Sequence, residues 1–172
     1  HGLMFAPETA TSNRAVIGGM IGNNSSGVMS IRYGRTSEHV EALDLLLANG
    51  ETKKGDRIHY SEPPLTAVTA PARPNRVSCP LFAALLSLAE RNRALIESRW
   101  PKVMRRVGGY ALDELLAPEP NFARFLCGSE GTLALTLEAT LSLVPVPPAI
   151  AIMAAHFRDL MECLRAVPAI VA

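Results

Sequence analysis

Charged and aromatic residues are both scarce in this chain of 172 residues. Charged residues make up 19% of it and aromatic residues 5%, and the formal net charge at pH 7 is only +1. A charge so close to balance argues against a protein that binds nucleic acid electrostatically. Apolar residues make up 48%, which is more than a disordered chain carries. The sequence therefore predicts a folded domain with no nucleic-acid partner.

Long hydrophobic runs, disulfide patterns and metal-ligand patterns are also lacking. The apolar runs are far shorter than the roughly 20 residues that span a bilayer, and no signal-peptide pattern opens the sequence. We expect a soluble protein of the cytoplasm, with a peripheral position at the inner membrane face left open. The three cysteines are isolated, which fits inert thiols in a reducing compartment. The four histidines show no metal-ligand spacing, so no metal site is predicted.

Small and polar residues, by contrast, crowd into the stretch from Pro7 to Gly34. Glycine lacks the Cβ atom that holds a ligand away from the backbone, and Ser and Asn add short hydrogen-bonding groups. A second stretch of this kind runs from Cys127 to Leu133. We hypothesise that the two stretches meet over one ligand.

Neither stretch contains a known nucleotide-binding motif. The pattern GxxxxGK[ST] is absent, and Gly18 and Gly19 are adjacent rather than spaced as in GxGxxG. What remains is a cradle of backbone amides and hydroxyl groups, which suits a pyrophosphate or a ribityl chain. The alternative is a pair of glycine-rich turns that pack closely and bind nothing.

Hydrophobic periodicity predicts both helices and strands. Helical spacing occurs from Ile17 to between Asn24 and Gly27, from Leu81 to Arg99, and from Asp159 to Val171. Strands are predicted at His39 to Ala48, Glu138 to Val144 and Ala149 to Ala155. The Asn49-Gly50 pair predicts a hairpin whose second strand begins at Glu51, and residues 55–80 predict a long proline-rich loop. These elements indicate an α+β fold with a mainly antiparallel sheet flanked by helices.

Five motifs follow one another in a distinctive order. They are PETATSNRAVIGGMIGNNSSG (7–27), IRYGRTSEHV (31–40), LLLANG (45–50), RRVGGYAL (105–112) and GSEGTL (128–133). Together they resemble the FAD-linked oxidase family of the vanillyl-alcohol-oxidase, or PCMH-type, FAD-binding fold. Within it, the chain is similar to D-lactate, glycolate and D-2-hydroxyglutarate dehydrogenases, especially to the large bacterial members with an iron–sulfur segment. The resemblance covers residues 2–148.

This resemblance implies a domain organisation. Residues 1–148 would be the second, C-terminal lobe of an FAD-binding domain, with 55–101 as an inserted loop and helix. Residues 149–172 would begin the following substrate or cap domain. Because the first FAD lobe and the substrate domain are missing, and the chain begins at His1 without a methionine, we expect a piece of a longer protein. An iron–sulfur cluster would lie elsewhere in that parent.

The resemblance also implies which residues contact FAD. The matching positions are Pro7, Glu8, Thr9, Ser12, Gly18, Gly19, Gly22, Asn23, Asn24 and Gly27 in the first stretch, and Glu130, Gly131 and Thr132 in the second. No catalytic base is assigned. Tyr110, Arg105 and Arg106 are candidates for a role near the flavin or a substrate carboxylate, with a structural or solvated role as the alternative.

The function implied is part of an FAD-dependent oxidoreductase that oxidises a small 2-hydroxy acid, with this chain supplying one wall of the FAD site. The electron acceptor is not identified. We expect the isolated chain to bind FAD weakly or not at all and to be inactive, because about half of the cradle is absent. The alternative is a non-catalytic domain that keeps this fold for assembly or electron transfer.

Overall fold

A computed structural model describes residues 1–50, 80–103, 105–118 and 120–171 of the chain. Helices are interspersed with short strands, and the strands of the described residues form two antiparallel two-stranded sheets. The predicted α+β class is therefore confirmed. The chain divides into two compact units, one formed by residues 1–4 with 144–172 and the other by residues 5–143.

The smaller unit is held together by its two short strands. Strand β1 (Leu3–Met4) pairs antiparallel with β4 (Val144–Pro145). The pairing continues for one further bond, in which the Val146 N–H donates to the Gly2 carbonyl at 2.9 Å.

The rest of the smaller unit differs in part from expectation. Helix α6 (Leu160–Val171) confirms the helix predicted there, but residues 149–155 form no strand. That prediction was wrong because an apolar run forms a strand only with a hydrogen-bonded neighbour. No described segment pairs with this one, and Ile150 and Ile152 are 81% and 96% exposed.

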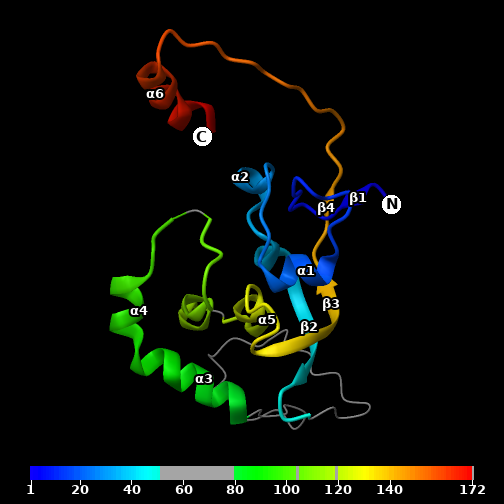
Figure 1. Cartoon of the computed structure of the whole chain (residues 1–172), viewed down its shortest axis with the longest axis vertical. Coiled ribbons are helices and arrows are strands. Elements are labelled where there is room, and N and C mark those ends of the chain that lie inside the picture. The colour runs from blue at the N-terminus through cyan, green and yellow to red at the C-terminus, as the bar shows by residue number, and fades with distance from the viewer. Residues whose placement is uncertain (51–79, 104, 119, 172) are drawn as a thin grey trace. The chain divides into compact units, whose positions relative to one another are not determined.

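An antiparallel ribbon forms the centre of the larger unit. Strand β2 (Val40–Leu47) lies beside β3 (Ala134–Leu141), as Figure 1 shows, with Leu43 opposite Ala139 and Leu47 opposite Ala134. The strand predicted at His39 to Ala48 is confirmed. Its side chains Val40, Leu43 and Leu45 are all buried. The strand therefore reads as an apolar run instead of an alternating one.

The partner of β2 lies far away in the sequence. The tight turn after β2 is present, with Gly50 at φ 73° and its N–H donating to the Leu47 carbonyl. The predicted return strand from Glu51 and the long loop at 55–80 lie largely or wholly outside the described residues. Strand β3 begins four residues before the predicted start at Glu138, because pairing with β2 extends to Ala134.

One core cluster packs α5 (Phe122–Leu126) against β2. Its buried members are Ile21, Val40, Leu43, Leu45, Ala123, Cys127 and Ala134. Because Ile21 lies in α1 (Ile17–Gly22), this cluster also anchors the first glycine-rich stretch on the sheet. Helix α1 begins where predicted but ends at Gly22, before the end that was predicted between Asn24 and Gly27.

A second core cluster lies under α3 (Pro80–Arg91) and α4 (Arg93–Arg99). It joins Ala89 and Ile96 to Leu115 of η3 (Leu112–Leu116) and to Phe125. A single helix was predicted from Leu81 to Arg99, but the structure breaks it at Asn92. There the side-chain amide donates to the Leu88 carbonyl at 2.8 Å, and asparagine favours such local bonds over helix continuation.

Two short helical turns connect α1 to the sheet. They are α2 (Ser30–Tyr33) and the 3-10 helix η1 (Thr36–His39). Among the described residues, no helix is long and apolar enough to cross a membrane.

The thiol of Cys127 is predicted to be inert in the folded chain. Burial raises the pKa of Cys127 to about 12, and its Sγ donates to the Ala123 carbonyl at 3.2 Å. Because the thiolate is the nucleophile, iodoacetamide should modify Cys127 only after unfolding, whereas the half-buried Cys163 should react in the native chain. Peptide mass spectrometry after native labelling measures both sites. Equal labelling of the two cysteines would contradict the expected burial.

Candidate functional site

The two glycine-rich stretches meet at the end of α1. The Gly128 N–H donates to the Ile21 carbonyl and the Glu130 N–H donates to the Gly22 carbonyl, each at 2.9 Å. The last carbonyls of a helix have no partner within it, so this pairing satisfies groups that would otherwise need water. The expected meeting of the two stretches is therefore observed.

The turn from Gly128 to Thr132 has an unusual backbone. Gly128, Glu130 and Gly131 all have positive φ, at 86°, 51° and 76°. The Thr132 hydroxyl donates to the Ser129 carbonyl at 2.5 Å, and the Thr132 N–H donates to the same oxygen at 2.9 Å. The backbone bonds to α1 and these local bonds hold the turn in its left-handed conformation.

Tyr110 is brought to this turn from a distant part of the sequence. Its hydroxyl oxygen lies 2.9 Å from Thr132 Oγ1. Because the Thr132 proton is already donated to Ser129, Tyr110 is the donor in this pair. The Tyr110 side chain is 43% exposed, so the hydroxyl pair lies at the surface beside the second glycine-rich stretch.

The glycines of the site differ in what surrounds them. A Cβ atom at Gly27 would lie 1.4 Å from the Glu8 carbonyl oxygen, so packing within the chain requires this glycine. At Gly18 and Gly131 a Cβ atom would meet nothing within 4 Å, and at Gly19 it would meet one side-chain carbon at 3.4 Å. Packing therefore does not explain the glycine pair in α1.

The predicted flavin-contacting residues fall into three groups by exposure. Exposed are Glu8, Ser12, Gly18, Gly19, Asn23, Glu130, Gly131 and Thr132; half-buried are Thr9, Gly22 and Gly27; buried are Pro7 and Asn24. Asn24 faces inward, since its Oδ1 accepts a bond from the Ser37 N–H at 2.9 Å. The exposed members lie on α1, on the segments on either side of it, and on the 128–132 turn.

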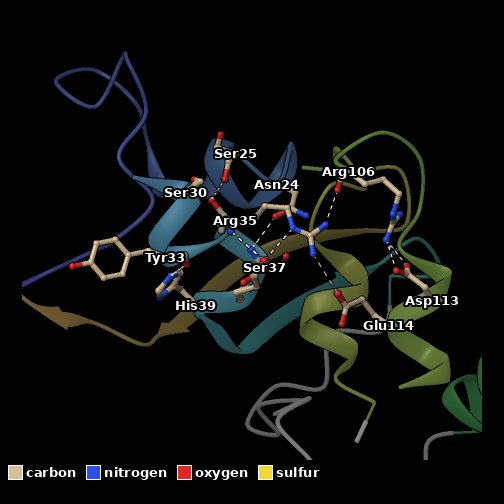
Figure 2. Close-up of polar contacts among 12 residues, drawn as sticks. Asn24, Ser25, Ser30, Tyr33, Arg35, Ser37, His39, Arg106, Asp113 and Glu114 are labelled. Carbon is tan, nitrogen blue, oxygen red and sulfur yellow. Dashed lines mark hydrogen bonds and ion pairs between the residues drawn. The ribbon is translucent and has the colours of Figure 1, made fainter. Parts of the chain in front are cut away.

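Sequence reasoning did not single out Arg35 as a functional position, yet it links three segments near the site. Figure 2 shows its guanidinium between the loop that follows α2 and the chain around Arg106 and Glu114. Its Nη1 donates to the Arg106 carbonyl at 2.6 Å, its Nε to Glu38 at 3.2 Å, and its Nη2 lies 3.8 Å from Glu114. The only sequence signal was its place in the IRYGRT motif.

Arg106, a candidate for a carboxylate clamp, is engaged within the chain. It pairs with Asp113 at 2.5 Å and stacks over the Trp100 ring at 4.7 Å from the centroid (Figure 2 shows the Asp113 pair). Its side chain is 11% exposed. These contacts favour the structural role that was the alternative for Arg106.

Burial raises the pKa of the Glu114 carboxyl above its usual range, and the nearby charge of Asp113 raises it further. Arg124, Arg35 and Arg106 act in the opposite direction. The ion pair with Arg35 is long, and it does not outweigh the loss of water around a mostly buried carboxylate. The folded chain therefore takes up a proton at Glu114 more readily than the unfolded chain does.

Histidine and cysteine do not build a metal centre in the described ranges, where no group of three or more His, Cys, Asp or Glu side chains is placed to hold an ion. The buried His39 is instead committed to packing. Its Nε2 lies 2.7 Å from the Tyr33 carbonyl, and its ring meets Phe5 edge-on at 5.9 Å.

Residues 1–56 match the sequence model of a protein family described as an FAD binding domain. The chain is also 37% identical to a D-2-hydroxyglutarate dehydrogenase of Pseudomonas putida, over 100% of this chain and 17% of that protein. It is 32% identical to the enzyme of the same name from Escherichia coli, over 97% of this chain and 16% of that protein. The resemblance to FAD-linked oxidases is confirmed.

A more distant match has a related name. The chain is 26% identical to glycolate oxidase subunit GlcD of Bacillus subtilis, over 85% of this chain and 20% of that protein. The chain thus spans about a fifth or less of the length of these relatives.

The described residues present an open surface at this site. Gly18 and Gly19 leave α1 open to close approach, and the N-cap Val16 offers no side-chain bond to the first amides of that helix. Beside the adjoining turn, the exposed Thr132 and Tyr110 add hydroxyl oxygens that can accept hydrogen bonds. Open backbone is the feature expected of a surface that contacts a phosphate or a ribityl chain.

Proposed function

We propose that this chain supplies one wall of the FAD site of a dehydrogenase that oxidises small 2-hydroxy acids. The family match to an FAD binding domain and the names of the relatives support the cofactor and the substrate class. The observation that carries the proposal is the open Gly18-Gly19 pair of α1. The last residues of this helix accept backbone hydrogen bonds from the turn that carries the open Gly131.

In this proposal each group of residues has a distinct role. The amides at the start of α1 bind the oxygen-rich arm of FAD, beside the exposed backbone at Gly131. Tyr110 and Thr132 orient the neighbouring part of the cofactor through their coupled hydroxyl groups. Pro7, Asn24 and Gly27 hold the loops in place, because they are buried or packed against backbone.

FAD, when bound, would supply the hydride acceptor for the substrate carbon. This chain is proposed to be the second lobe of the FAD-binding domain, so the opposite wall and the substrate domain belong to the rest of the parent. The isolated chain should accordingly bind FAD weakly. An iron–sulfur cluster elsewhere in the parent and a cytoplasmic location, with the inner membrane face left open, stay predictions.

A pair of glycine substitutions tests the proposed site in the parent protein. Gly18→Ala and Gly19→Ala place methyl groups where FAD would approach the backbone. The purified variants should therefore retain at most about one tenth of the flavin that the unsubstituted protein holds, as measured by absorbance. Ala94→Val, which adds volume at an exposed position of α4, is the matched control and should leave flavin content unchanged. Full flavin content in both glycine variants would overturn the assignment of this wall.

The substrate class is tested separately by anaerobic titration of the flavin-loaded parent. D-2-hydroxyglutarate, D-lactate and glycolate are added in turn, and bleaching of the flavin absorbance is expected with at least one of them. If the parent holds FAD but none of these acids bleaches it, the alternative of a non-catalytic assembly or electron-transfer domain is favoured.

A further inference from the structure

A cavity of about 560 Å³ lies between α4, the segment that follows it, and η3. Its volume is within the range of small-molecule sites. Ile96, Trp100 and Leu116 supply apolar wall. No residue predicted to contact FAD lines this cavity, so it is not explained by the proposed function.

The charges around the cavity are unequal. Four cationic side chains line it but only two carboxylates, and both carboxylates are neutralised locally. Glu97 pairs with Arg93 at 3.2 Å, and Asp113 pairs with Arg106 at 2.5 Å. Lys102 is the lining cation for which the described part of the chain shows no partner. Within the described residues, the positive charge of Lys102 at the cavity is therefore uncompensated.

One wall of the cavity is a rigid stacked pair. The Arg106 guanidinium lies 4.7 Å from the centre of the Trp100 ring and also pairs with Asp113. Beside this stack, Leu116 supplies apolar surface for the hydrocarbon part of a ligand, whereas Ile96 is only 5% exposed. The exposed ammonium group of Lys102 can make a charge-assisted bond to an anionic ligand at this cavity.

We propose that this cavity binds a small aliphatic carboxylate. The carboxylate lies at Lys102, and the hydrocarbon chain lies against Leu116 beside the Trp100–Arg106 stack. The binding site goes beyond the proposed flavin wall, because it needs no cofactor and uses none of the residues assigned to FAD.

Trp100 makes the test direct, because it is the single tryptophan of the chain and lines the cavity. Pentanoate is titrated into the full chain at constant ionic strength, with sodium chloride as the balancing salt, and Trp100 fluorescence is followed. We expect a saturable change. Pentanamide, which has nearly the same shape without the charge, should bind at least about tenfold more weakly. No saturable change with pentanoate, or equal binding of the amide, overturns the proposal.

Two matched variants separate this site from general charge attraction. Lys102→Gln should weaken pentanoate binding about tenfold, which is the effect of losing one good charge-assisted bond. Arg105→Gln removes an equal charge from a neighbouring exposed position that does not line the cavity, and it should change the affinity less than about twofold. Both residues are exposed, so neither variant should unfold the chain. Equal losses in the two variants would assign the effect to net charge and overturn the proposed site.

Discussion

Replacing Gly27 with alanine should lower the free energy of unfolding of the chain by about 3 kcal/mol, a typical cost for forcing extra volume into a packed position. The added Cβ atom would lie 1.4 Å from the carbonyl oxygen of Glu8 and 2.9 Å from the amide nitrogen of Thr9. Both are backbone atoms, so no side-chain rotation relieves the clash. The loop that carries Pro7 to Thr9 would have to move away. Urea unfolding followed by circular dichroism measures the loss.

Gly18→Ala is the matched control, because it adds the same methyl group in the same stretch. Gly18 lies within α1, and a Cβ atom there meets nothing within 4 Å. Alanine is a better helix former than glycine by roughly 1 kcal/mol, so this variant should be as stable as the unsubstituted chain or slightly more stable. If Gly27→Ala and Gly18→Ala were equally stable, the close approach of Gly27 to the Glu8 backbone would be wrong.

Replacing Arg35 with alanine should lower the free energy of unfolding by about 2–3 kcal/mol, as expected for a mostly buried cation bonded to charged groups and backbone. The substitution removes the donor to the Arg106 carbonyl and leaves Glu38 and Glu114 without this cation. Three chain segments lose their common link. Urea unfolding at several pH values measures the effect.

The pH dependence of Arg35→Ala follows from Glu114. Arg35 lowers the pKa of Glu114 against the larger opposing effect of burial, so its removal lets that pKa rise further. The lost attraction is present in full when Glu114 is ionised and disappears when it is protonated. The stability difference between the two proteins should therefore be largest above the Glu114 pKa and shrink as the pH falls through it.

Arg35→Lys separates the geometry of the guanidinium from its charge. Lysine keeps the positive charge but cannot reach the Arg106 carbonyl, Glu38 and Glu114 with one planar fork, so it should recover only part of the loss. Arg105→Ala, at an exposed neighbouring position, should change stability by less than about 0.5 kcal/mol. Full recovery with lysine would show that only the charge at position 35 matters.

Local periodicity was enough to predict several elements closely. Strand β2 and helix α6 lie within a residue or so of their predicted bounds, because each has a strong apolar pattern of its own. Strand β3 was predicted with a shift of several residues, since its extent is set by pairing with β2. The break at Asn92 was missed because a side-chain bond to the Leu88 carbonyl competes with an otherwise helical pattern.

The two glycine-rich stretches were recognised from the sequence, but the roles of their individual residues were not. Their order and composition supported the resemblance to FAD-linked oxidases, which the family match over residues 1–56 bears out. The assignment of individual flavin-contacting residues stays a prediction. Within the stretch, Gly18 and Gly27 look equivalent in the sequence, although one is open and the other is packed against backbone.

The sequence by itself determined the α+β class, the apolar runs of the core, and the two glycine-rich stretches with the family they resemble. Only the tertiary structure decided which glycines are free to face a ligand, and that Arg35 joins segments near Arg106 and Glu114. The physical reason is that such roles depend on distances between residues far apart in the chain. Hydrophobic pattern encodes which face of an element is buried, but not which backbone atom lies 1.4 Å from a missing Cβ.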